Sequence, residues 1–238
     1  MTHELTVTGT RGRPTGIRAV VFDFDDTLAD TLMARVDAWQ RTFDWAGIVE
    51  PSAADFVSDQ RGVSLVGSVE RLHKTRGIDP EAMLDTYRSA YWAKEPGLLR
   101  LFDGVPELVT ALREASVPMG IVTSKGRDLL IDGRAAGTLV ELDELGLGWL
   151  RPHTVGFEDV TQPKPHPEGL LRVLDSLGVA PGEALVVGDS SADILAAHNG
   201  GCWSALAGWG VPVDQREMAK ATPDVVAEHP AALRALLG

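Results

Sequence analysis

Acidic residues gather directly after a short apolar run near the start of the chain. Asp23, Asp25 and Asp26 follow the apolar residues 20–22. A carboxylate can attack phosphorus as a nucleophile, and a neighbouring carboxylate can protonate the leaving oxygen and later deprotonate the attacking water. We therefore expect Asp23 to be the nucleophile of a phosphoryl-transfer reaction and Asp25 to be its acid and base.

Polar segments also follow apolar runs at three later places in the chain. They span residues 123–125, 161–167 and 188–193. Thr123 and the backbone N–H of Ser124 can hydrogen-bond a phosphoryl group, and Lys164, between two prolines, can bring a positive charge to it. These residues are the expected phosphate-binding groups. Lys125 is expected to face solvent.

The carboxylates predict a bound divalent cation. Asp23 and Asp189 would lie at the same edge of a sheet, where two like charges raise each other's pKa unless a cation neutralises them. A ligand set made only of oxygen atoms favours Mg²⁺. We expect Asp23, Asp189 and the backbone carbonyl of Asp25 to be its ligands.

Short apolar runs alternate with helical patterns along most of the chain. The expected strands are 18–22, 118–122, 153–157, 184–187 and 202–206. Continuously apolar strands are typical of a parallel sheet that helices cover on both faces. The pattern predicts a doubly wound, Rossmann-like α/β fold, in which ligands bind at the carboxyl ends of the strands. That edge would bring the four polar segments together.

One interval interrupts the alternation. Residues 31–96 show helical spacing with no convincing strand, which predicts an inserted α-helical cap domain. Residues 18–30 and 97–238 would form the α/β core domain, and residues 1–17, which are polar, a flexible N-terminal segment. The segment 127–148 is rich in glycine and acidic residues, and its role stays open.

Four of these segments together resemble the motifs of the haloacid dehalogenase superfamily. The resemblance covers residues 18–238 and rests on Asp23-Phe24-Asp25-Asp26-Thr27, Val122-Thr123-Ser124-Lys125, Pro163-Lys164-Pro165 and Gly188-Asp189 to Asp193. The helical insert resembles the small cap of the branch that contains phosphoglycolate phosphatase, β-phosphoglucomutase and related pyrophosphatases. Gly208-Trp209-Gly210 resembles the phosphoglycolate-phosphatase-like members.

The resemblance implies a role for each matching residue. Asp23 would be nucleophile and metal ligand, Asp25 acid/base and carbonyl ligand, and Asp189 a metal ligand. Asp193 would orient Lys164 or a metal-bound water. The dehalogenase branch lacks the second acidic residue of the first motif, so its presence argues against C–halogen hydrolysis. Arg61 lies where related enzymes place residues that contact the substrate, and is a possible cap contact.

Composition limits the partners. The formal net charge of −12 argues against nucleic-acid and anionic-membrane binding, and residues 1–16 contain no apolar run that could serve as a signal peptide. The single cysteine, Cys202, excludes an internal disulfide and is expected to be an inert core thiol. A cytoplasmic protein, either monomer or homodimer, is the expectation.

The expected function is a Mg²⁺-dependent phosphatase for a small phosphorylated metabolite such as phosphoglycolate or a sugar phosphate. A sugar-phosphate mutase is the alternative, since it would use the same core residues and differ in whether water or a second hydroxyl attacks the aspartyl-phosphate. A non-catalytic binding protein on the same fold is the remote alternative, because it would be expected to have lost part of the acidic set.

Overall fold

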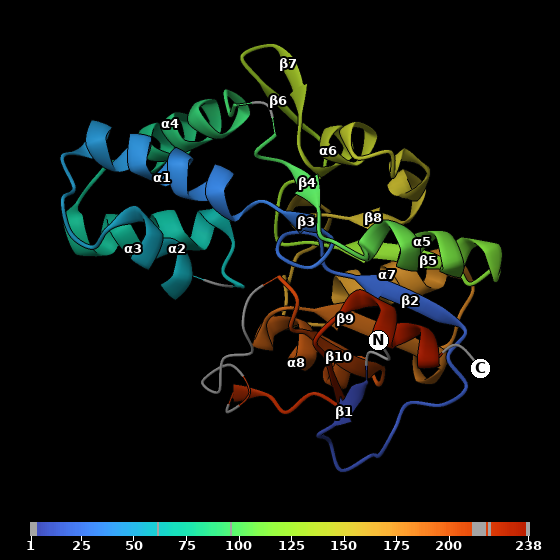
Figure 1. The fold of residues 1–238 in the computed structure, drawn as a ribbon. Coiled ribbons are helices and arrows are strands. Elements are labelled where there is room, and N and C mark those ends of the chain that lie inside the picture. The colour runs from blue at the N-terminus through green and yellow to red at the C-terminus, as the bar shows by residue number, and fades with distance from the viewer. Residues whose placement is uncertain (1–3, 61, 96, 211–217, 219, 237–238) are drawn as a thin grey trace.

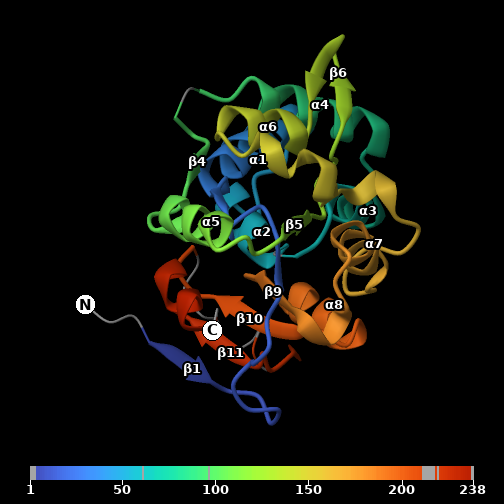
Figure 2. The ribbon, with the colours of Figure 1, turned by 90° about the vertical axis from the view of Figure 1, so that its right-hand side faces the viewer.

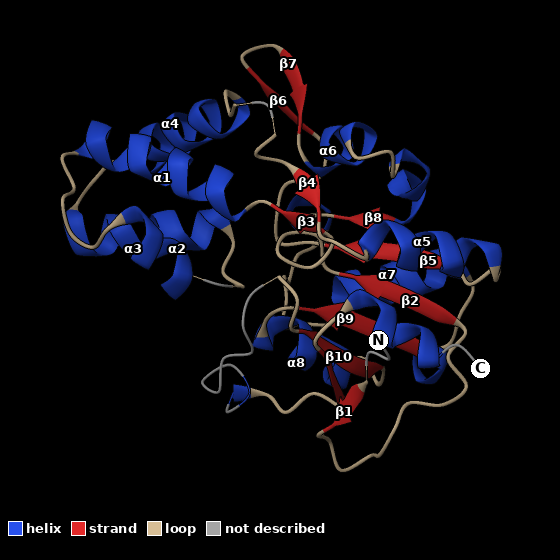
Figure 3. Cartoon of the chain, viewed as in Figure 1, coloured by secondary structure: helices blue, strands red, loops and turns tan. Residues whose placement is uncertain are grey.

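A seven-stranded sheet organises the larger part of the chain (Figures 1 and 3). The computed structural model describes residues 4–60, 62–95, 97–210, 218 and 220–236. The strands are β1 (Leu5–Val7), β2 (Ala19–Phe22), β3 (Ala29–Asp30), β4 (Arg100–Leu101), β5 (Met119–Val122), β6 (Leu129–Ile131), β7 (Arg134–Ala136), β8 (Thr154–Val155), β9 (Ala184–Gly188), β10 (Trp203–Ala207) and β11 (Val225–Ala227). The α-helices are α1 (Leu32–Ala46), α2 (Ala53–Asp59), α3 (Leu65–Arg76), α4 (Pro80–Trp92), α5 (Val105–Glu114), α6 (Thr138–Glu144), α7 (Glu168–Leu177) and α8 (Ser191–Asn199). Short 3₁₀ helices are η1 (Gly148–His153), η2 (Phe157–Asp159), η3 (Pro181–Glu183) and η4 (Pro230–Leu236).

The sheet is parallel except at one edge. Its strand order is β1-β11-β10-β9-β2-β5-β8, and only β1 runs antiparallel to its neighbour. Successive side chains of β2 point to opposite faces, and both faces are buried. Val20 and Phe22 pack in one apolar cluster and Val21 in another. The α/β fold predicted from the apolar runs is confirmed.

Helices cover both faces of this sheet. Helix α7 packs on β5 and β8, and α8 packs on β9 and β10. Helix α5, which contacts η4, lies on the other side, as the rotated view in Figure 2 shows. Cys202 is fully buried between these layers, and burial raises the pKa of its thiol to about 12. The thiolate is therefore suppressed, as expected for an inert core cysteine.

The first described residues of the chain differ from the expected flexible segment. Leu5–Val7 form β1, which pairs antiparallel with β11 at the sheet edge. Beyond it, the backbone N–H groups of Thr8 and Gly9 donate to the carbonyl of Asp224. The strand has only three residues and is largely exposed, so it forms no continuous apolar run that would reveal it in the sequence. Its position depends on backbone pairing with a strand at the other end of the sequence.

Helices α1–α4 pack around an apolar core of their own, at the left of Figure 1. Trp39 lies at its centre, with ring centroids 4.7 Å from both Phe56 and Tyr87. The two connections to the sheet run side by side as the antiparallel pair β3–β4, and Arg100 donates to the Asp30 carboxylate across it. This region contains the helices that the sequence predicts, and the described residues between 32 and 92 form no strand.

The segment whose role stayed open contains a hairpin and a helix. Strands β6 and β7 pair antiparallel around Asp132 and Gly133, which have φ angles of 51° and 73°, and α6 follows. The next expected strand, 153–157, is shorter than predicted: β8 covers Thr154–Val155, and Phe157 begins the 3₁₀ helix η2. Within the described ranges, no helix combines the length and apolarity needed to cross a membrane. Cytoplasmic location stays a prediction.

Candidate active site

Asp23 lies at the carboxyl end of β2, in the middle of the sheet. Its backbone N–H donates to the carbonyl of Val187 on β9 over 2.8 Å, which continues the strand pairing up to the carboxylate itself. The ammonium group of Lys164 donates to Asp23 Oδ1 over 2.6 Å. Lys164 comes from the loop that precedes α7, so the fold joins residues 141 positions apart in sequence.

Lys164 is fixed by more than one acceptor. It also donates to Asp193 Oδ1 over 2.6 Å and to the backbone carbonyl of Val122 over 3.1 Å, and its side chain is only 8% exposed. Asp193 in turn accepts from the hydroxyl and the backbone N–H of Ser190 through Oδ2. Both oxygens of Asp193 are thus engaged, and the residue holds Lys164 in position beside Asp23.

A cluster of carboxylates provides a site whose chemistry fits a divalent cation. One carboxylate oxygen each of Asp23, Asp189 and Asp193 lie within 4.8 Å of one another, and all three residues are buried. Burial raises the pKa of Asp23 despite the opposing charge of Lys164, and Asp193 and Asp25 raise it further. Burial, followed by the charges of Asp23 and Asp193, raises the pKa of Asp189 well above its usual range. A hard cation relieves this repulsion, and the donors are oxygen atoms only, so the cluster fits Mg²⁺.

Asp25 has a different electrostatic environment. Its Oδ1 accepts from Thr31 Oγ1 over 2.7 Å and from Lys125 Nζ over 3.1 Å. Burial favours a higher pKa, but Lys125, Arg35 and the hydrogen bond from Thr31 outweigh it and hold the pKa of Asp25 below its usual value. These surroundings therefore favour the ionised form of Asp25. The expectation that Lys125 faces solvent is wrong, because its side chain is only 16% exposed and pairs with Asp25.

Lys125 belongs to a buried polar network that the sequence did not indicate. It donates to Glu141 Oε2 and to the Tyr91 hydroxyl, over 2.7 Å in each case, and the Tyr91 hydroxyl donates to Glu141 Oε1 over 2.7 Å. Lys94 lies 3.4 Å from the same carboxylate, whose side chain is fully buried. Tyr91 and Lys94 come from the helical insert and Lys125 and Glu141 from the core, so the network joins the two.

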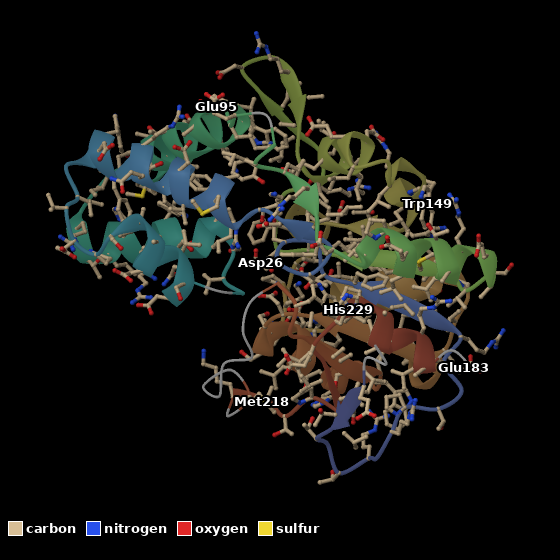
Figure 4. All side chains as sticks on the ribbon, viewed as in Figure 1. Asp26, Glu95, Trp149, Glu183, Met218 and His229 are labelled. Carbon is tan, nitrogen blue, oxygen red and sulfur yellow. The ribbon has the colours of Figure 1, made fainter. Side chains whose placement is uncertain are left out.

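The turn that follows Asp25 is held by contacts from both parts of the chain. Asp26 adopts a positive φ of 61°, and its side chain pairs with Arg35 on α1. The indole N–H of Trp209 donates to the carbonyl of Thr27 over 2.8 Å. Figure 4 labels Asp26 at the junction between α1–α4 and the sheet. These contacts fix the backbone beside Asp23 and Asp25.

A cavity of about 360 Å³ opens beside these residues, between the helical insert and the sheet edge. Asp23, Asp25, Thr123, Ser124 and Lys125 line its core side. Thr123 is buried, and its hydroxyl accepts from the backbone N–H of Lys125 over 3.1 Å. The structure thus brings Thr123 and Ser124, two of the predicted phosphate binders, to the same cavity as the predicted nucleophile. Lys164, the third, does not line this cavity but contacts Asp23 directly.

The insert approaches the core closely beside this cavity. A Cβ atom added to Gly62, whose φ is +74°, would lie 2.9 Å from Ser190 Oγ. The approach therefore requires a residue without a side chain. Arg61, the predicted cap contact, lies outside the described residues.

Comparisons with known proteins agree with this geometry. The family model described as "haloacid dehalogenase-like hydrolase" matches residues 20–207. Pyrophosphatase PpaX of Halalkalibacterium halodurans is 31% identical over 82% of this chain and 85% of its own length. A phosphoglycolate phosphatase of Xanthomonas campestris is 31% identical over 90% of this chain and 93% of its own.

A solved structure of a haloacid dehalogenase-like hydrolase from Streptococcus pneumoniae superposes with a TM-score of 0.75 at 25% identity, covering 94% of this chain and 99% of that one. The family match spans the strands that carry Asp23, Thr123 and Asp189, and the relatives match over most of their own length. The resemblance inferred from the four motifs is confirmed, and the chain belongs to the haloacid dehalogenase-like hydrolases, as an enzyme of the phosphatase type.

Proposed function

We propose that the protein is a Mg²⁺-dependent phosphatase that hydrolyses a small phosphorylated metabolite through an aspartyl-phosphate on Asp23. The observation that carries the proposal is the position of the Asp23 carboxylate, which lines the cavity together with Asp25, Thr123 and Ser124 and contacts Lys164. The similarity to a pyrophosphatase and a phosphoglycolate phosphatase supports phosphoryl chemistry.

In the first step Asp23 attacks phosphorus and the bond from phosphorus to the leaving oxygen breaks. Asp25 gives its proton to that oxygen. The negative charge of the bound substrate raises the pKa of Asp25 and opposes the effect of Lys125, which allows Asp25 to carry this proton. Lys164, Thr123 and the backbone N–H of Ser124 bind the phosphoryl oxygens and neutralise their charge.

In the second step water attacks phosphorus and Asp25 accepts its proton. The bond between phosphorus and Asp23 breaks, and inorganic phosphate leaves. Asp23, Asp189 and the carbonyl of Asp25 would hold Mg²⁺, which supplies a positive charge that neutralises and orients the phosphoryl group. Asp193 acts through Lys164 and Ser190 as a positioning residue. Residues 31–96 would act as the cap that excludes bulk water from the cavity.

The test is phosphate release from p-nitrophenyl phosphate with Mg²⁺ or with EDTA. We expect Asp23→Asn to lose activity by at least about a thousandfold, since it removes the nucleophile. Asp85→Asn, an exposed carboxylate on α4, is the matched control and should retain full activity. Full activity of Asp23→Asn, or equal activity in EDTA, would contradict the mechanism.

A panel of phosphoglycolate, sugar phosphates, nucleotides and pyrophosphate then identifies the substrate. Phosphate release from one of them at a kcat/KM far above that of p-nitrophenyl phosphate is the expected result. Interconversion of a sugar phosphate without phosphate release would instead favour the mutase.

A further inference from the structure

Beyond the carboxylates, the cavity beside Asp23 has mostly apolar walls, to which both the helical insert and the core contribute. Its volume of about 360 Å³ lies in the range of cavities that enclose drug-sized ligands. The apolar and aromatic lining residues include Leu65, Val66, Tyr87, Trp92, Leu129 and Phe157. Hydroxyl groups buried against such walls would lose their hydrogen bonds to water without replacement. The walls therefore favour a ligand with an apolar or aromatic body over a polyol.

The cations around the cavity differ in whether they are neutralised. Among the described lining residues these cations are Arg35, Arg88 and Lys125. Arg35 pairs with Asp26, and Lys125 pairs with both Asp25 and Glu141. The Nε atom of Arg88 is buried, and within the described part of the chain it has no hydrogen-bond partner. Arg88 is thus the lining cation whose guanidinium is not matched by a described carboxylate.

A guanidinium without a paired carboxylate, beside an apolar cavity, favours the binding of an anionic group. A buried donor without an acceptor destabilises the protein, and a carboxylate or phosphate can satisfy a guanidinium with two parallel hydrogen bonds. Arg88 lies on α4 of the helical insert, whereas Asp23 and Thr123 lie at the sheet edge. A ligand whose phosphate meets Asp23 could therefore extend across the cavity to Arg88.

The hairpin β6–β7 shapes the same part of the cavity. Leu129 on β6 is one of the lining residues, and Asp132 at the turn accepts from Ser89 Oγ on α4 over 3.5 Å. The segment 127–148 thus contributes an apolar wall residue and reaches the helix that carries Arg88. The segment 127–148 therefore forms part of the wall of the proposed substrate cavity.

We propose that the cavity selects a phosphomonoester whose body is apolar or aromatic and whose far end carries an anionic group that pairs with Arg88. This inference rests on the proposed phosphatase function, since it assumes that the phosphate occupies the Asp23 end. It adds the chemical class of the part of the substrate beyond the phosphate, and it identifies Arg88 as the residue that binds the anionic end.

The test compares three probes with Mg²⁺: phenyl phosphate, 4-carboxyphenyl phosphate and glycerol 3-phosphate. The wild-type kcat/KM should be highest for 4-carboxyphenyl phosphate and lowest for glycerol 3-phosphate. Arg88→Gln should lower the ratio of the carboxyphenyl to the phenyl value by about ten- to a hundredfold, the range expected for a charge-assisted hydrogen bond. Comparing this ratio between variants cancels the intrinsic reactivity of the two leaving groups.

Two further variants make the result specific. Arg88→Lys keeps the positive charge but loses the planar guanidinium that can donate two parallel hydrogen bonds. It should give a ratio of carboxyphenyl to phenyl values between those of the wild type and Arg88→Gln. Arg71→Gln, an exposed arginine on α3 that does not line the cavity, should keep the wild-type ratio. An unchanged ratio in Arg88→Gln would overturn the role of Arg88, and a preference for glycerol 3-phosphate would overturn the apolar body. Failure of the phosphatase function is distinct: no probe would release phosphate, or Asp23→Asn would retain full activity.

Discussion

At the scale of single residues, the site places two nearby carboxylates in opposite electrostatic environments. Burial raises the pKa of Asp23 and nearby acids raise it further, whereas Lys125 and Arg35 hold the pKa of Asp25 down. Attack on phosphorus requires an ionised Asp23, and a cation held by Asp23 and Asp189 would lower the pKa of Asp23 towards its usual range. Without a cation, however, an ionised Asp23 destabilises the folded protein.

This cost predicts a pH dependence of stability in the presence of EDTA. The pKa of Asp23 is about 7 in the folded protein, against about 4 for an unfolded aspartate. Between these values the folded state binds a proton that the unfolded state lacks, so the free energy of unfolding falls as pH rises from about 4 to 7. The contribution is at most about 1.4 kcal/mol per pH unit for one proton.

Asp23→Asn should make this slope shallower, because asparagine does not titrate. Urea denaturation at pH 5, 6, 7 and 8 measures the slope. Asp85→Asn should retain the wild-type slope. Parallel slopes for wild type and Asp23→Asn would show that the carboxylate is ionised in the fold throughout this range.

At the scale of elements, α6 and the end of α4 meet through Glu141. This carboxylate accepts from Lys125 and Tyr91 and lies 3.4 Å from Lys94, and it is fully buried. Hydrogen bonds from both the core and the insert therefore end on one side chain. The same network reaches Asp25 through Lys125, so the position of the helical insert and that of the expected acid/base are linked.

Removing the Glu141 carboxylate should lower the free energy of unfolding substantially. Glu141→Ala leaves two ammonium groups without their shared counter-charge, and breaking a buried ion pair in this way typically destabilises a protein by about 3–5 kcal/mol. The free energy of unfolding from urea denaturation measures the effect. Glu144→Ala, at an exposed position of the same helix, should change stability by less than about 0.5 kcal/mol. An equally small change in Glu141→Ala would show that the network contributes little to the stability of the fold.

At the scale of the whole molecule, the apolar core of helices α1–α4 and the apolar clusters of the sheet meet at one cavity. The core around Trp39 is separate from the clusters that cover the sheet, and the pair β3–β4 connects them. Asp23 and Asp189, the expected side-chain ligands of the cation, directly follow β2 and β9 in the centre of the sheet. A ligand that binds there should stabilise the larger part of the chain.

Mg²⁺ should therefore raise the thermal midpoint of unfolding. At a concentration of 100 times its Kd, a ligand that binds only the folded state contributes about 2.7 kcal/mol, which corresponds to roughly 5–10 °C for a chain of this size. Differential scanning calorimetry at pH 8, with Mg²⁺ and with EDTA, measures the shift. Asp189→Asn should lose most of it, and Asp85→Asn should retain it. An equal shift in Asp189→Asn would place the cation elsewhere.

Much of the fold could be predicted because its signals are local. The apolar run that ends at Phe22 and the amphipathic spacing of 168–177 depend only on neighbouring residues, and both form the expected elements. The spacing of Asp23 and Asp25 after a strand, repeated in polar segments after later strands, was sufficient to indicate phosphoryl chemistry and the family. The roles of these residues and the metal stay predictions, to be tested as described above.

Other features depend on contacts between distant parts of the chain. Local sequence predicts a solvent-facing Lys125, because its partners Asp25, Tyr91 and Glu141 lie 100, 34 and 16 positions away. Strand β1 required β11, at the other end of the sequence. Local periodicity cannot report such pairs, since folding alone brings them together. The family and the phosphatase class were therefore readable from the sequence, whereas the cavity beside Asp23 required the folded chain.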